Sequence, residues 1–135
     1  MSDKEIIEIA GYPVTPETLR GIWEDIRSEL VSDFPIARSI EMPSVYAFVV
    51  PRKEYRRVFK QLKHSKHIIN TEKTEWGEEG APSTSAFAFK SERGWVILKR
   101  ERFGYAVEAD LKHELTHIWE EILGLVWGKL TRKTD

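Results

Sequence analysis

The chain has 135 residues, enough for one domain with its own core, and we expect residues 1–135 to form a single domain. Its net charge of −1 produces no overall field that would select nucleic acid or an acidic membrane. The absence of cysteine excludes disulfides, a thiol nucleophile and thiolate metal ligands, so any metal must be held by histidine and carboxylate. The N-terminus has no signal-peptide core and no apolar run is long enough for a membrane span, so we expect a soluble, cytoplasmic protein without membrane contact.

The first half of the chain begins with an irregular arm or short strand and then shows the pattern of a helix followed by a strand. Thr15-Pro16-Glu17 is typical of an N-cap, a proline at the first helical position and an acid in the first turn. Apolar residues then recur at helical spacing, which predicts a helix over 16–32. The β-branched and aromatic run over 44–50 predicts a strand.

A second helix is predicted over 52–66, and it has a strongly basic face. The simplest interpretation is a solvated helix face, and the alternative is a docking surface for an acidic partner or nucleic acid. His64 and His67 lie near its end, where histidines at this spacing are more often surface residues than ligands. The positive charges are Arg52, Lys53, Arg56, Arg57, Lys60, Lys63 and Lys66.

The second half of the chain predicts a β-hairpin followed by a helix. An acidic loop over 68–83 precedes two strands, 84–90 and 95–100, which a tight turn at 91–94 connects. The last helix is expected over 106–123. Together with the first half, this order predicts an α+β fold. A small mixed or antiparallel sheet of three or four strands would pack against the N-terminal helix and the last helix.

The last predicted helix contains the pattern His-Glu-x-x-His. His113 and His117 lie one turn apart on the same helix face, so their imidazoles can share one metal ion. Glu114 projects beside that face, where its carboxylate can accept a proton from a water molecule that the metal activates. Two ligands and a general base on one helix are the arrangement of a zinc hydrolase, and they predict Zn²⁺ as the cofactor.

The setting of the motif favours this interpretation. A scrambled chain of this composition, with its 4 histidines, would contain the pattern only about 0.015 times. Leu111, Leu115, Ile118 and Ile122 recur at helical spacing and form the expected buried stripe, and the histidines fall off that stripe. The alternative is a helix whose histidines are merely solvated or bonded to neighbouring residues.

The region from Ser85 to Trp119 resembles the catalytic subdomain of the zincin metallopeptidases. It is most similar to the gluzincins, the thermolysin-like and CAAX-prenyl-protease-like enzymes. Those enzymes carry an Asn-Ala-Phe-type edge strand, a second strand and then the metal helix. The resemblance implies that Ser85, Ala86 and Phe87 lie on an edge strand, Ser85 replacing the usual Asn. A peptide substrate would add to that strand through main-chain hydrogen bonds.

The third metal ligand is the open question within this resemblance, because gluzincins take a Glu from a separate helix further downstream. Glu120 is the candidate here, since it lies three residues beyond His117 and shares its helix face. It must reach back along the axis, because it lies about 10.5 Å from His113. The alternative role for Glu120 is an acid that supports the ligands or faces solvent. The third ligand could also come from a second subunit, or it could be His64, His67, Glu78 or Glu79.

The function predicted from the sequence is zinc-dependent hydrolysis of peptide bonds in a peptide or protein substrate. In this prediction His113 and His117 hold zinc, and Glu114 is the general base. One alternative is a metal-stabilised binding module that acts through the basic helix 52–66 on nucleic acid or an acidic partner. Nucleic acid is the less favoured partner, and no oligomeric state is predicted. A second alternative is a zincin-derived protein without turnover.

Overall fold

The computed structural model describes residues 12–51, 53–55, 57, 69–70, 86–91, 94–101, 106–125 and 129–130. These residues form both helices and a sheet, so the predicted α+β class is confirmed. Within the described part of the chain, no helix combines the length and the apolar composition that crossing a membrane requires.

The first long helix, α2, spans Pro16–Leu30 and begins as the sequence predicts. Thr15 is the N-cap, and its hydroxyl oxygen accepts a hydrogen bond from the Thr18 amide at 3.3 Å. Proline at the first helical position costs no hydrogen bond, because that amide has no partner inside a helix. The apolar face of α2 is buried, and its members are Leu19, Ile22, Trp23, Ile26 and Leu30.

The sheet has five strands in the order β1-β2-β5-β4-β3. The expected three or four strands correspond to three strands of six or seven residues, and two further strands contain only two residues each. The sheet is mixed, because β2 and β5 are parallel and the other neighbours are antiparallel. Their bounds are β1 Tyr12–Pro13, β2 Val45–Val50, β3 Ile69–Asn70, β4 Ala86–Ser91 and β5 Gly94–Arg100.

The predicted hairpin is formed by β4 and β5, which pair from Ala86↔Lys99 to Ser91↔Gly94. Gly94 has a φ of +130°, a conformation that L side chains rarely adopt. A Cβ atom at this position would lie 2.5 Å from the carbonyl oxygen of Ser44. Glycine therefore lets the start of β5 approach the segment that leads into β2, where the Trp95 amide donates to the Ser44 oxygen at 2.8 Å.

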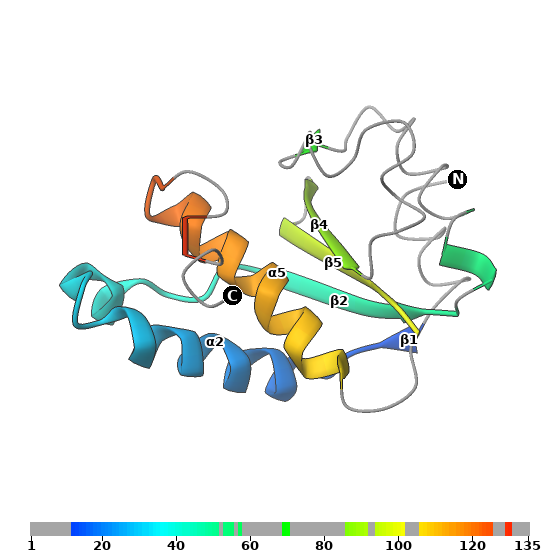
Figure 1. Cartoon of the computed structure of the whole chain (residues 1–135), viewed down its shortest axis with the longest axis horizontal. Helices are drawn as coiled ribbons and strands as arrows, with labels where there is room; N and C mark the ends of the chain where they lie inside the picture. The colour runs from blue at the N-terminus through cyan, green and yellow to red at the C-terminus, as the bar shows by residue number, and fades with distance from the viewer. Residues whose placement is uncertain are drawn as a thin grey trace.

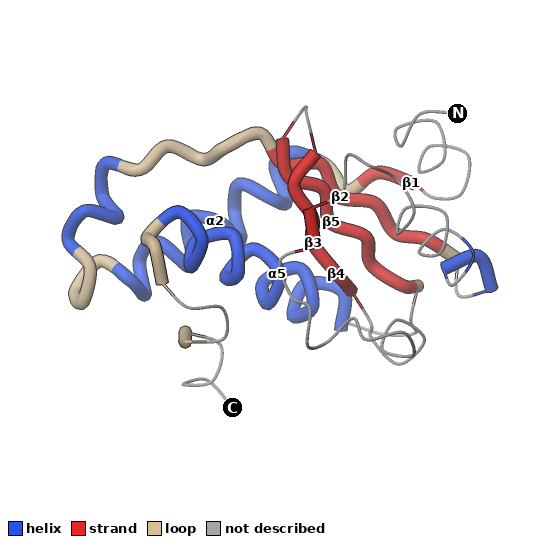
Figure 2. The backbone as a smooth tube through the Cα atoms, turned by 90° about the horizontal axis from the view of Figure 1, so that it is seen from above, coloured by secondary structure: helices blue, strands red, loops and turns tan. Residues whose placement is uncertain are grey.

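The second long helix, α5, spans Ala106–Ile122 and contains the His-Glu-x-x-His motif. It packs against α2, and both helices contribute to one core with the same face of the sheet. Figure 1 shows the two helices side by side next to the strands, and Figure 2 shows the same two layers from above. The sheet contributes Ala47, Ala88, Trp95 and Ile97 to this core.

A 3₁₀ helix, η1, spans Pro35–Ser39 and was not predicted. Arg27 of α2 holds the segment, because its guanidinium donates to the carbonyl oxygen of Ala37 and, at 2.7 Å, to that of Ile40. The same guanidinium lies 5.5 Å from the ring centroid of Trp119, a cation–π distance. Arg27 thus links the segment after α2 to helix α5.

Candidate metal centre

The motif helix α5 is positioned by its apolar face. Leu111, Leu115 and Ile118 are fully buried, so the predicted stripe is confirmed at these three positions. It is wrong at Ile122, the last residue of the helix, which is 38% exposed. Because the three buried side chains face α2 and the sheet, the helix cannot rotate without exposing them. Both histidines were expected to lie off this buried stripe; His113 is exposed as expected, whereas His117 is buried.

The two imidazoles meet through their Nε2 atoms, which lie 3.1 Å apart. Their rings are nearly perpendicular, at 88°, with centroids 4.6 Å apart. Bonds from zinc to imidazole nitrogen are about 2.0–2.1 Å long, so two of them spanning 3.1 Å would meet at roughly 100°. That angle is close to the tetrahedral geometry of zinc, and the pair therefore fits a single ion.

The Nδ1 atom of His117 lies 2.6 Å from Oε1 of Glu120. An ionised carboxylate only accepts hydrogen bonds, so His117 donates from Nδ1 and, when neutral, has its lone pair on Nε2. This lone pair points to Nε2 of His113. Two lone pairs at 3.1 Å repel each other, so the contact needs either a proton on His113 Nε2 or a cation between the rings.

Glu114, the expected general base, follows His113 directly and is 3% exposed. His113 is exposed whereas Glu114 is buried, because successive residues of a helix point in different directions and Glu114 faces the core. Burial of a carboxylate is costly unless it is compensated, so a position of this kind is often functional.

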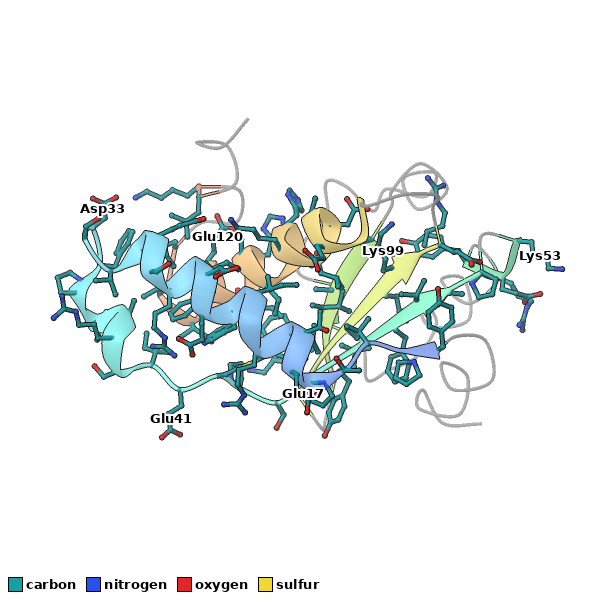
Figure 3. All side chains as sticks on the ribbon, turned by 90° about the horizontal axis from the view of Figure 1, so that it is seen from below. Glu17, Asp33, Glu41, Lys53, Lys99 and Glu120 are labelled. Atoms are coloured by element: carbon teal, nitrogen blue, oxygen red, sulfur yellow. The ribbon has the colours of Figure 1, made fainter. Side chains whose placement is uncertain are left out.

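Glu120 is completely buried, but it does not converge with the two Nε2 atoms. It lies at the Nδ1 side of the His117 ring, and its second oxygen, Oε2, accepts a hydrogen bond from the Leu130 amide at 2.7 Å. Figure 3 shows Glu120 among the side chains around the two long helices. Of the two roles considered for Glu120, this placement favours support of a ligand over ligation.

Buried polar side chains concentrate around α5. Four residues of the described part are buried and polar or charged, and three of them lie on α5: Glu114, His117 and Glu120. The fourth, Lys99 of β5, pairs with Asp110 of α5 at 2.7 Å and donates to the Arg100 carbonyl oxygen at 2.6 Å. The sequence reasoning missed Lys99, although it lies on the same strand face as Ile97, two residues earlier, and continues the run of buried residues that begins at Trp95.

The expected substrate strand is only partly an edge. β3 lies outside β4 in the sheet and pairs with it at Phe89 and Lys90, so the expectation that β4 is the outermost strand is wrong. β3 could not be predicted from the sequence, because two residues carry no periodic pattern. Ala86 and Phe87 pair with β5 on one side, and Ser85 lies outside the described residues.

The basic helix is described only at residues 53–55 and 57, which are helical. Lys53 is exposed, and Arg57 forms an ion pair with Glu54 at 2.6 Å. Most of the predicted basic face lies outside the described residues. The same holds for the further ligand candidates His64, His67, Glu78 and Glu79.

Across the described residues, no group of three or more His, Asp or Glu side chains is arranged to hold a metal ion. The described part of the candidate centre is therefore a pair of histidines. Comparisons with protein-family models, with curated proteins and with solved structures find no match to this chain. The resemblance to zincins thus rests on the motif and on the order of strands and helix around it.

Proposed function

We propose that the protein is a zinc-dependent hydrolase that cleaves peptide bonds. The observation that carries this proposal is the 3.1 Å approach of the Nε2 atoms of His113 and His117. Two nitrogens at this distance are suited to one metal ion, and the chemistry of the donors favours zinc. The Nδ1 atom of His117, on the opposite side of the ring from Nε2, is hydrogen-bonded to Glu120. Metal-ligating histidines commonly have such a bond to a carboxylate.

In this proposal His113 and His117 would hold zinc, which as a Lewis acid would polarise a carbonyl group and make a bound water acidic enough to lose a proton near neutral pH. Glu114 accepts that proton and later delivers it to the leaving amine. The carboxylate is not needed to hold the metal, because the histidines do so. Glu114 directly follows His113 on α5, as the His-Glu-x-x-His motif requires.

A peptide substrate is proposed to lie along β4, beside Ser85, Ala86 and Phe87. The support is the resemblance to zincins together with the general tendency of extended peptides to add to a strand. Because β3 pairs with Phe89 and Lys90, such a peptide would extend no further than Ala88. The third ligand is proposed to come from residues outside the described part, such as His64, His67, Glu78 or Glu79, or from a second subunit.

The direct test of the metal site is zinc stoichiometry by elemental analysis after removal of free metal. We expect about one zinc per chain in the wild type and loss of tight binding in His113→Ala and His117→Ala. The variants His64→Ala and His67→Ala serve as comparisons. Each should lose zinc affinity only if the replaced histidine is the third ligand. Undiminished zinc content in both His113→Ala and His117→Ala would refute the assignment.

A further inference from the structure

The carboxylate of Glu120 is engaged at both oxygens. Oε1 lies 2.6 Å from His117 Nδ1, and Oε2 accepts from the Leu130 amide at 2.7 Å. The side chain is completely buried. A buried carboxylate is tolerated when hydrogen bonds to charged or polar donors replace its lost hydration, and these two contacts supply such donors.

The Leu130 amide reaches Glu120 because the chain reverses at the end of α5. Gly124 has a φ of +72°, the left-handed conformation that commonly ends a helix. The Leu125 amide donates to the Glu120 carbonyl oxygen at 2.8 Å, and the Gly124 amide donates to that of Glu121 at 3.2 Å. These two bonds form a Schellman motif, the backbone arrangement that ends the helix at this point. Leu130 then packs its buried side chain into the main core.

The contact with Leu130 also limits how Glu120 can act. To ligate a metal at the Nε2 side of His117, its carboxylate would have to leave both Nδ1 and the Leu130 amide. Each of those groups is buried and would lose its hydrogen bond. Remaining in place, Glu120 keeps the proton of His117 on Nδ1 and the lone pair on Nε2.

We propose that Glu120 is a positioning residue that acts through His117. We also propose that the turn at Lys129 and Leu130 is part of the metal centre. The Leu130 amide holds the Glu120 carboxylate, and the carboxylate holds the His117 ring with Nε2 toward His113. Because docking of Lys129 and Leu130 holds His117 in the orientation that binds metal, it should favour metal binding, and metal binding must then favour docking by the same factor. The metal part of this inference rests on the proposed function, whereas the positioning of His117 does not.

The first arm of the test uses metal-free protein at about pH 8, above the ordinary pKa of histidine of about 6.5. Nitrogen-15 NMR reports which ring nitrogen of His117 carries the proton, and hydrogen exchange reports the protection of the Leu130 amide. In the wild type we expect the Nδ1–H tautomer and a protected amide. In Glu120→Ala we expect a shift toward Nε2–H and Leu130 exchange at least about tenfold faster.

Glu120→Gln is the conservative variant, because glutamine has the same shape but only one acceptor oxygen. His117 and Leu130 contact different oxygens of Glu120, so the single oxygen of glutamine can replace only one of the two contacts in place. We therefore expect this variant to restore either the His117 tautomer or the protection of the Leu130 amide, but not both. Glu121→Gln is the matched control, since this exposed neighbour on the same turn should leave both signatures unchanged.

The second arm measures zinc affinity by competition with a chelator. We expect Glu120→Ala to bind zinc about 10–100-fold more weakly than the wild type, with Glu120→Gln in between. Unchanged affinity in Glu120→Ala, or an unchanged His117 tautomer in both variants, would overturn the positioning role. If the wild type binds no zinc, the proposed function fails, and the tautomer measurement still decides whether Glu120 positions His117.

Discussion

The indole rings of Trp23 and Trp119 stack with centroids 4.1 Å apart and planes inclined by 18°. Both residues are completely buried, and they join α2 to the motif helix α5 next to Glu120. Stacked aromatic pairs contribute more than their buried area alone. This contact therefore fixes the helix that presents His113 and His117.

Replacing Trp23 should accordingly destabilise the protein strongly. We expect Trp23→Ala to lower the free energy of unfolding by about 3–5 kcal/mol, because it leaves a large cavity. Trp23→Phe should cost less, since it keeps a ring and removes a buried indole N–H for which the described residues provide no acceptor. Chemical denaturation measures both values, and Ile36→Ala at an exposed position should change stability by no more than about 0.5 kcal/mol.

Two glycines should respond to alanine in opposite directions. Gly94→Ala should destabilise by more than about 1 kcal/mol, because of its positive φ and the nearby Ser44 oxygen. Gly21 is exposed on α2, and a Cβ atom there would meet no described atom within 4 Å beyond its own helix, so Gly21→Ala should stabilise by about 0.5–1 kcal/mol. Thermal and chemical unfolding of the two variants test the pair together. Equal effects would contradict the close approach of β5 to Ser44.

The ion pair between the buried Lys99 and the partly exposed Asp110 should be sensitive to loss of its carboxylate. Asp110→Ala leaves the ammonium of Lys99 buried without this counter-charge, and we expect a loss of about 3–5 kcal/mol in unfolding free energy. Lys99→Met should cost less, because the Asp110 side chain is partly exposed and can be hydrated. These values come from equilibrium denaturation of each variant.

The control for this pair is the contact between Lys112 and Glu29, which has a similar distance of 2.6 Å but lies at the surface. Exposed ion pairs contribute only about 0–1 kcal/mol, so Lys112→Met should have little effect. If Asp110→Ala and Lys112→Met cost the same, burial does not determine the strength of the Lys99 contact.

The sequence was sufficient to predict the long elements with strong local patterns. The start of α2 at Thr15 and Pro16, the strand over 44–50, the hairpin and the helix beginning at Ala106 all follow from caps, turns and periodicity. The spacing of His113 and His117 also predicted that their side chains would meet, because four residues make about one helical turn.

The features that were missed depend on contacts between distant residues. η1 is held by Arg27, β3 is formed by pairing with β4, and the parallel pairing of β2 with β5 connects strands separated by a long crossover. The orientation of Glu120 was also undetermined, because helical spacing gives its face and not its partner. Its second partner, Leu130, is a backbone amide, and a backbone amide has no signature in the amino-acid sequence.

The most direct test of the proposed function compares the peptidase turnover of the wild type and Glu114→Gln at equal zinc content. Glutamine keeps the size of the side chain and removes its basicity, so we expect zinc binding and stability to be retained. Turnover of a diverse peptide library should fall by about two to four powers of ten, the usual contribution of general acid–base catalysis. Glu108→Gln, at an exposed position of the same helix, should leave turnover unchanged. Equal turnover of Glu114→Gln and the wild type, or a zinc-loaded wild type that cleaves no peptide in the library, would contradict the proposal.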